Sequence, residues 1–288
     1  MVAVFLLFRR FFYRNQVDTP DAYRPSTRYC KELLLRKERV TPCAHGGDQE
    51  FGDIANSLEA FQRAIEGGIS CIEVDLSITK DDVLVAVHDR DLGRFMKRSV
   101  SGPTHRFASR DLLEAGVSTF EEVFELASEY RIKVIVDVKT TSEEKSGVLL
   151  DRLVNMLAQR PDNSNEVIIW CKDDDLLKHL HDRTPSYVRI GLTVMDLPGK
   201  GDPFRVSNAA YPRMNVVGQH WEFGTQKQVK SLTEKGKRVY LWTSDTPFMM
   251  SKSLEQCPEA ILTSYPRILR DMMDAWKMHC MDTQKDEI

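Results

Sequence analysis

The stretch CIEVDL, residues 71–76, sets two carboxylates at alternate positions between apolar residues. Side chains at alternate positions of a β-strand point to the same face, so Glu73 and Asp75 share one face and the apolar residues share the other. Two like charges on the inner face of a sheet are costly unless a counter-charge neutralises them. The stretch therefore predicts either a buried strand with a divalent cation at its acidic face or an ordinary amphipathic surface strand.

A second stretch, VIVDVK at residues 134–139, shifts the balance towards a buried acidic site. Asp137 and Lys139 have the same alternate spacing and share a face. A carboxylate near the carboxyl end of a buried parallel strand belongs at the catalytic face of a barrel. Lys139 either contacts phosphate oxygens or serves only as an ion-pair partner of Asp137.

Outward from these two stretches, short apolar runs alternate with helical patterns. Runs with strand character lie at residues 40–44, 70–78, 83–87, 133–138, 167–171, 187–194, 214–219, 238–243 and 260–264. Helical patterns lie at residues 57–66, 119–130, 147–159, 174–181, 226–235, 247–256 and 268–277. Strands that alternate with helices form right-handed βαβ units and a parallel sheet. About eight such units predict an α/β fold, a TIM-type (β/α)8 barrel over residues 40–277.

Three segments fall outside the predicted barrel. Residues 1–14 are apolar and then basic, which resembles the end of a membrane anchor, although the apolar run is shorter than the roughly 20 residues that span a bilayer. Residues 15–39 are interpreted as a polar linker, and residues 278–288 as an acidic disordered tail. Membrane association through the N-terminus and a cytoplasmic location both remain open.

Composition excludes several classes of protein. The net charge of −3 provides no basic field for nucleic acid. The six cysteines contain no CxxC pair, so a zinc knuckle is not expected; we expect buried thiols, with disulfides as the alternative in a secreted chain. The chain also lacks the GxSxG motif of serine hydrolases and the Walker A motif of nucleotide-binding proteins.

Two histidines follow predicted strands and are candidates for general acid and base. His45 ends one run and precedes Gly46-Gly47, where the backbone can approach a ligand closely. His88 follows the run at residues 83–87. Two histidines at strand ends beside an acidic cluster predict an acid/base pair. His220 also follows a strand, and the remaining histidines have no comparable context.

The order and spacing of these motifs resemble the glycerophosphodiester phosphodiesterase family over about residues 40–276. The matching pieces are His45-Gly46-Gly47, Ala55-Asn56-Ser57, Glu73-Val74-Asp75, Lys80-Asp81, His88-Asp89, Asp137-Val138-Lys139, Trp242-Thr243 and residues 261–266. The resemblance implies a PLC-like phosphodiesterase barrel that uses a divalent cation, Mg²⁺ or Ca²⁺, to hydrolyse glycerophosphodiesters to glycerol 3-phosphate and an alcohol. It also implies roles for individual residues: metal ligands Glu73, Asp75 and Asp137, acid and base His45 and His88, and substrate contacts Lys139 and Trp242.

The chain departs from the family pattern at three positions. Gly46 stands where the family has arginine, Ala55 where it has glutamate, and Asp137 where it has a longer glutamate. Losing one charged phosphate contact costs about 2–4 kcal/mol, or roughly 10²–10³ in rate, by analogy with lost oxyanion donors. We therefore expect reduced activity, with Asp53 or Glu50 as candidates to replace the missing carboxylate.

Two alternative functions remain open. The first is a lysophospholipase D acting on lipid diesters, which the segment at residues 1–14 favours because it could bring the barrel to a membrane. The second is a barrel that binds phosphodiesters or lipids without catalysis, which Gly46 and Ala55 favour. The expected partner is a small-molecule glycerophosphodiester, with membrane contact through the N-terminal segment as a further candidate; the sequence indicates no protein partner.

Overall fold

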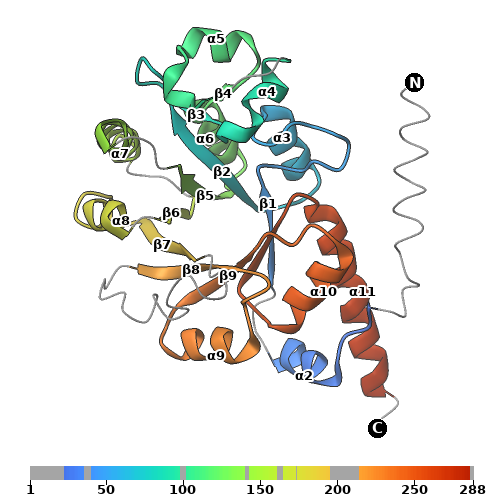
Figure 1. The fold of residues 1–288 in the computed structure, drawn as a ribbon. Coiled ribbons are helices and arrows are strands. Elements are labelled where there is room, and N and C mark those ends of the chain that lie inside the picture. The colour runs from blue at the N-terminus through green and yellow to red at the C-terminus, as the bar shows by residue number, and fades with distance from the viewer. Residues whose placement is uncertain are drawn as a thin grey trace, which may run out of the picture.

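A computed structural model of the chain shows a barrel of parallel strands surrounded by helices (Figure 1). The described residues are 23–35, 40–97, 102–139, 143–160, 165–172, 174–194 and 214–285. The candidate membrane segment at residues 1–14 lies outside them. Among the described helices, none combines the length and the apolar character needed to cross a membrane.

Eight parallel strands form the barrel wall in the described part of the chain. β1 pairs with both β2 and β10, so the order β1-β2-β5-β6-β7-β8-β9-β10 closes into a ring. The strands are β1 Thr41–His45, β2 Cys71–Ile78, β5 Lys133–Val138, β6 Val167–Cys171, β7 Val188–Val194, β8 Met214–His220, β9 Arg238–Trp242 and β10 Ala260–Thr263. The closed ring confirms the predicted TIM-type (β/α)8 fold.

Helices cover the outside of this ring (Figure 1). They are α3 Leu58–Glu66, α6 Phe120–Glu129, α7 Glu143–Ala158, α8 Asp174–His181, α9 Gln226–Glu234, α10 Pro247–Glu255 and α11 Pro266–Lys285. Polar caps mark several of their starts. Thr119 and Thr225 each form a capping box with the residue three positions later, which satisfies backbone N–H groups that the first turn leaves unpaired.

The predicted strand at residues 83–87 is not a wall strand. β3 Leu84–Ala86 pairs antiparallel with the end of β2, and β4 Ser118–Thr119 pairs antiparallel with β3. The five residues between β2 and β3 are too few for a parallel crossover, which needs a dozen or more. The insertion after β3 contains η2 Asp89–Asp91, α4 Leu92–Phe95, η3 Thr104–Arg106 and α5 Ser109–Glu114. The described part of this insertion therefore consists of short helical turns beside the barrel mouth.

Strand alternation divides the side chains between two cores. On β2, Ile72, Val74 and Leu76 are fully buried in the layer between the strands and the helices. Burial of each such side chain contributes about 1.5–3 kcal/mol. Cys71 faces the barrel interior with Trp170 and other apolar side chains. Glu73 and Asp75 are the next two inward-facing residues of β2 after Cys71, so they lie progressively closer to the mouth at the carboxyl ends of the strands.

The linker and tail predictions are wrong where the structure describes them. Within the predicted linker at residues 15–39, residues Thr27–Leu35 form α2, and within the predicted tail at residues 278–288, α11 continues to Lys285. The two helices lie side by side (Figure 1). Tyr29 and Trp276 stack edge to face with ring centroids 4.9 Å apart. Mutual burial of these apolar faces, together with the Cys30–Cys280 disulfide, stabilises both segments.

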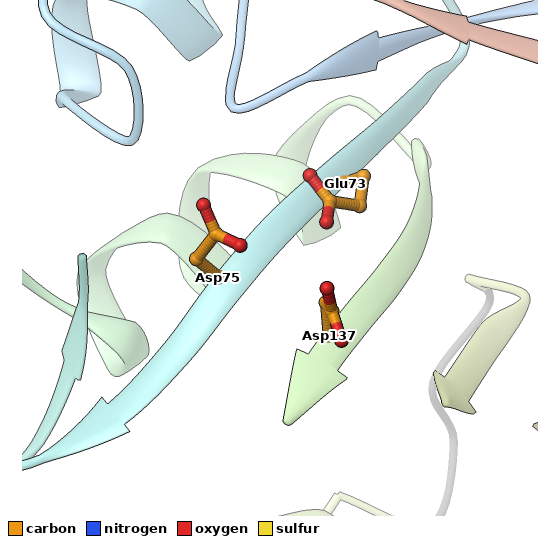
Figure 2. Close-up of side chains that lie close together, drawn as sticks. All are labelled: Glu73, Asp75 and Asp137. Carbon is orange, nitrogen blue, oxygen red and sulfur yellow. The ribbon is translucent and has the colours of Figure 1, made fainter. Parts of the chain in front are cut away.

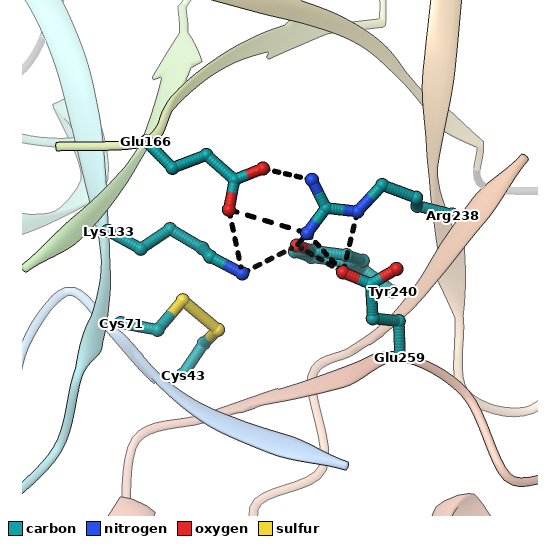
Figure 3. The surroundings of a disulfide bond; sticks show 7 residues. All are labelled: Cys43, Cys71, Lys133, Glu166, Arg238, Tyr240 and Glu259. Atoms are coloured by element: carbon teal, nitrogen blue, oxygen red, sulfur yellow. Dashed lines mark hydrogen bonds and ion pairs between the residues drawn. A yellow bond between two sulfur atoms is a disulfide. The ribbon is translucent and has the colours of Figure 1, made fainter. Parts of the chain in front are cut away.

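The expectation of buried thiols is wrong for four of the six cysteines. Cys43 and Cys71 form a disulfide inside the barrel with Cα atoms 4.6 Å apart (Figure 3). The register of β1 against β2, two consecutive parallel strands joined by α3, sets these two residues opposite each other. Cys171 and Cys257 remain buried thiols.

Next to this disulfide, charged side chains meet at the amino ends of the strands (Figure 3). Arg238 donates from Nε to Glu259 at 2.6 Å and pairs with Glu166. The Lys133 ammonium pairs with Glu166 at 3.1 Å and donates to the Tyr240 hydroxyl at 3.2 Å. Opposite charges face one another throughout this group, so this end of the barrel is closed by a neutralised network.

Candidate active site

The predicted acidic residues converge at the opposite end of the barrel. β2 and β5 run parallel in a register that sets Asp75 beside Asp137, and β1 sets His45 beside Glu73. Figure 2 shows Glu73 and Asp75 on one strand facing Asp137 on the next. The alternate spacing read from the two stretches therefore brings these carboxylates to one place.

The three carboxylates form a compact group. Glu73, Asp75 and Asp137 each offer an oxygen atom within 4.8 Å of the others. Glu73 and Asp75 are both only 1% exposed. The Lys139 ammonium lies 2.5 Å from Asp75 Oδ1 and also pairs with Asp137. One ammonium among two buried carboxylates and a partly buried one, Asp137, leaves an excess of negative charge, and oxygen donors in such a group suit a hard divalent cation.

The pKa values of the acidic group reflect this imbalance. Burial, followed by the charges of Asp75 and Asp137, raises the pKa of Glu73 well above its usual value. Burial also raises the pKa of Asp137. Burial opposes ionisation of Asp75 as well, but Lys139 and His45 outweigh it and hold the pKa of this carboxyl below its usual range. The group thus contains one firmly ionised carboxylate, Asp75, and two whose ionisation burial disfavours.

Neighbouring groups orient these carboxylates. The backbone N–H of Gly46 donates to Glu73 Oε2 at 3.2 Å, and Gly46 has a left-handed φ of +62° that favours glycine. Asn56 Nδ2 donates to Asp75 Oδ2 at 2.7 Å, and the Asp75 backbone N–H donates to Asn56 Oδ1 at 2.9 Å. The loop after β1 therefore fixes both acidic side chains of β2.

Both candidate histidines lie at this mouth. His45 ends β1, and His88 follows β3. Burial lowers the pKa of each imidazole, with nearby Asp75 opposing that effect. His88 Nδ1 accepts a hydrogen bond from the Arg90 backbone N–H at 3.3 Å, whereas buried His45 Nδ1 has no hydrogen-bond partner in the described part of the chain. Neutral imidazoles in this position can accept and return protons near neutral pH.

A pocket of about 100 Å³ opens at the centre of this end of the barrel. Its lining combines acids, cations, histidines and aromatic rings: His45, Glu73, His88, Arg90, Asp137, Lys139, Trp170, Lys172, Thr193, Trp242, Thr243 and Leu262. Every predicted site residue is in this lining except Asp75, which contacts the lining residue Lys139 from behind. Such a pocket, with several polar groups converging on it, has the composition of a small-molecule site.

The sequence reasoning missed several lining residues. Arg90 comes two residues after His88, and Lys172 directly follows β6. Trp170 and Thr193 point inward from β6 and β7. Because ligand-binding residues of such barrels follow the carboxyl ends of the strands, a systematic search of the residues after each predicted strand could have found both cations.

The structure accounts for part of the departures at Gly46 and Ala55. A Cβ atom on Gly46 would stand 3.1 Å from the Ala55 Cβ, so the two small residues pack closely. Neither suggested replacement carboxylate reaches the acidic group. Asp53 pairs with Arg63, and Glu50 pairs with Arg267 at 2.9 Å. The missing carboxylate therefore has no substitute from these two positions.

Other motif residues support the insertion beside the mouth. Asp81 accepts hydrogen bonds from the backbone and hydroxyl of Ser109 at 2.7 and 2.6 Å. Asp89 Oδ1 accepts from the Thr104 backbone N–H at 2.8 Å. His220 stacks edge to face on Trp242 with centroids 5.4 Å apart and lies beside the pocket lining. These aspartates hold loops in place, and His220 belongs to the aromatic surroundings.

Sequence comparison finds relatives over most of the chain. The sequence profile of the glycerophosphoryl diester phosphodiesterase family matches residues 45–268. Glycerophosphodiester phosphodiesterase GDPD4 of Arabidopsis thaliana is 29% identical over 256 residues, covering 83% of this chain and 75% of the relative. A glycerophosphodiester phosphodiesterase of Caldanaerobacter subterraneus is 25% identical over 250 residues, covering 80% of this chain and 96% of the relative.

Solved structures show the same fold. The glycerophosphodiester phosphodiesterase of Thermotoga maritima superposes with a TM-score of 0.65 at 21% identity, covering 82% of this chain and all of that one. A phosphodiesterase of Oleispira antarctica, solved with the product sn-glycerol-3-phosphate, superposes with a TM-score of 0.68 at 19% identity, covering 82% of this chain and 96% of that one. At these identities the likeness concerns the barrel architecture.

Proposed function

Since this chain belongs to the glycerophosphoryl diester phosphodiesterase family, a family of phosphoric diester hydrolases, we propose that it hydrolyses glycerophosphodiesters to glycerol 3-phosphate and an alcohol. The observation that carries the proposal is the meeting of His45, His88 and Lys139 with the acidic group in one pocket. A charged phosphodiester needs cations to hold its oxygens and groups that move protons. The pocket offers both.

A divalent cation fits the residues present. Glu73, Asp75 and Asp137 would hold it, because their buried oxygens converge and carry more negative charge than Lys139 neutralises. When bound, such an ion polarises a phosphoryl oxygen and stabilises charge that develops there. Hard oxygen donors favour Mg²⁺ or Ca²⁺ over softer metals. The raised pKa of Glu73 supports the same conclusion, since a cation would remove the cost of ionising it.

The two histidines would share the proton transfers. Burial favours the neutral form of both imidazoles, so one of them can take the proton of the attacking hydroxyl, from water or from the substrate. The other ring, in its protonated form, which the charge of Asp75 favours, would give a proton to the leaving alkoxide. His45 is anchored on a wall strand and His88 on the insertion, so they approach the pocket from different elements.

Two cations would bind the phosphodiester. Lys139 is held beside the acidic group, where its ammonium also faces the pocket. Arg90 would supply the guanidinium that Gly46 cannot offer. Its guanidinium makes a long contact of 3.7 Å with the Asp91 carboxylate, so it remains able to turn towards a phosphate. Its positive charge adds to the effect of burial in lowering the pKa of both His45 and His88. A planar guanidinium can bind two phosphate oxygens at once.

Trp242 would form an apolar wall for the substrate. Its ring lies at the end of β9 and lines the pocket opposite the acidic strands. Indole surfaces bind the carbon skeleton of polar ligands while their N–H offers one hydrogen bond. Trp242 Nε1 is buried and has no hydrogen-bond partner among the described residues, so it is available for a hydroxyl group.

The test is product formation by the purified full-length protein. With a divalent ion present, we expect glycerol 3-phosphate from glycerophosphoglycerol and glycerophosphocholine, detected by a coupled enzymatic assay. Preference for lysophosphatidylcholine over these soluble diesters would favour the lysophospholipase D alternative instead. Calorimetric binding of a diester without any product would favour a non-catalytic barrel and overturn the proposal.

A further inference from the structure

Aromatic side chains gather at the carboxyl ends of β8 and β9. His220 lies within stacking distance of Trp221 and Phe223, with ring centroids 6.0 and 5.6 Å away, and edge to face with Trp242. Trp221 in turn meets Phe248 at 6.4 Å. An aromatic wall beside a phosphodiester pocket would ordinarily suit a quaternary ammonium group, because the ring faces attract cations.

In this chain a lysine already occupies the ring face that borders the pocket. The Lys172 ammonium lies 5.3 Å from the centroid of the Trp242 ring. Lys172 follows β6, three strands away from β9 around the barrel, so its side chain reaches across the mouth. Both residues line the pocket. A fixed positive charge therefore stands where an ammonium head group would bind.

The floor of the same pocket presents unused polar atoms. Trp170 is 1% exposed and Thr193 is 6% exposed, and in the described part of the chain neither Trp170 Nε1 nor Thr193 Oγ1 has a hydrogen-bond partner. Buried polar atoms without partners are costly, and a ligand rich in hydroxyl groups would satisfy them. The pocket thus combines cations at its mouth with hydrogen-bonding groups at its floor.

We infer that Lys172 makes this site select glycerophosphodiesters whose leaving alcohol is an uncharged polyol over those whose alcohol carries a quaternary ammonium. The inference rests on the proposed function and names the substrate class of that site. A choline head group would have to displace the ammonium from Trp242 and would then be repelled by it. A polyol meets neither obstacle and can hydrogen-bond to the same lysine.

The size of the preference follows from the charges involved. An ammonium loses a cation–π contact and gains a like charge at close range, and each effect lowers kcat/KM by roughly fivefold at a partly exposed site. We expect kcat/KM for glycerophosphoglycerol to exceed that for glycerophosphocholine by at least about tenfold, with the ratio falling at high salt because exposed charges are screened.

The experiment compares this ratio in four proteins: wild type, Lys172→Met, Lys172→Arg and Lys252→Met. Lys172→Met should lower the ratio about tenfold by restoring turnover of the choline ester, and Lys172→Arg should keep it. Lys252→Met is the matched control, because Lys252 also lies over an aromatic ring, that of Phe248 at 5.5 Å, yet neither residue lines the pocket. The control should leave the ratio unchanged.

The outcomes separate the inference from the proposed function. Hydrolysis of both esters with an unchanged ratio in Lys172→Met would overturn the inference and leave the proposed function intact. A wild-type preference for glycerophosphocholine would overturn it as well. Failure of every protein to release glycerol 3-phosphate from any diester would instead contradict the proposed function itself.

Discussion

The two ends of the barrel differ in whether their charged side chains are balanced by opposite charges. At the amino ends of the strands, Arg238 and Lys133 meet Glu166 and Glu259, so each of these partly buried charges has an opposite partner. At the carboxyl ends, three carboxylates share the single ammonium of Lys139. A matched network stabilises the fold by itself, whereas an unmatched one is costly until a ligand completes it. The contrast indicates that one end maintains the barrel and the other binds and transforms a ligand.

The largest expected effect is the loss of a histidine at the carboxyl end. His45→Ala and His88→Ala should each lower kcat by about 10³ or more, since a positioned acid or base contributes roughly 10²–10⁴. Neither change should lower the melting temperature by more than a few degrees, because His45 Nδ1 has no hydrogen-bond partner among the described residues and His88 Nδ1 accepts one long hydrogen bond, at 3.3 Å from the Arg90 backbone N–H. Steady-state product release with thermal melts of the same samples checks this. More than a tenth of wild-type activity in either variant would contradict the assigned roles.

Glu73→Gln should separate activity from stability. Turnover should fall by about 10² or more, because the change removes a charged ligand from the acidic group. In metal-free protein the variant should melt higher than wild type at pH 8.

The pH dependence of that difference has a definite sign. Because the folded pKa of Glu73 is raised, wild-type stability is fully present below the unfolded value of about 4.5 and declines as pH rises towards the folded pKa. The melting difference should therefore vanish near pH 4 and grow with pH. A variant that melts lower than wild type at pH 8 without metal would show that the acidic group is not strained.

Arg90→Gln tests whether a cation outside the acidic group also binds the phosphate at the carboxyl end. We expect kcat/KM to fall about tenfold, as for loss of one charge-assisted phosphate contact. Arg94→Gln is the matched control, because both arginines lie 3.7 Å from Asp91 but only Arg90 lines the pocket. Equal losses in the two variants would assign the effect to the loop around Asp91 rather than to phosphate binding.

The smallest effect on activity is expected at the amino end. Glu166→Gln should leave kcat within about twofold of wild type, because Glu166 lies below the pocket floor, but should cost about 1–3 kcal/mol of stability by leaving Arg238 with one carboxylate fewer. Arg238 and Lys133 outweigh burial and lower the Glu166 pKa to about 2. Its contribution is therefore present above about pH 4.5 and is lost as pH falls towards 2. Urea unfolding of wild type and variant at pH 7 and at pH 3 measures the loss of unfolding free energy at each pH. An equal loss at the two pH values would contradict the ion-pair origin.

Much of the active end follows from strand periodicity. The alternation of Glu73 with Asp75, and of Asp137 with Lys139, was enough to predict one face for each pair, because the side-chain period of a strand is two. The order of strands and helices was enough to predict a barrel, which then brings the carboxyl ends of β2 and β5 together. These features depend on local pattern and on rules of parallel connection.

The features that the sequence did not reveal depend on contacts between distant residues. Cys43 meets Cys71 because of the register of β1 against β2, which the strand pattern alone does not specify. The helix beyond residue 277 persists because it packs on α2, about 250 positions away. Arg90 and Lys172 are isolated cations in polar segments, and only their place after predicted strands distinguishes them from surface residues. Their position at the pocket appears only with the folded barrel.

The most direct test of the account is metal dependence measured on one sample. Purified protein is stripped with a chelator, dialysed and assayed for release of glycerol 3-phosphate from glycerophosphoglycerol, before and after addition of Mg²⁺ or Ca²⁺. The account predicts loss of turnover on stripping and its recovery with at least one of the two ions, because the acidic group carries more negative charge than Lys139 neutralises. Turnover that persists unchanged in the stripped protein would contradict it.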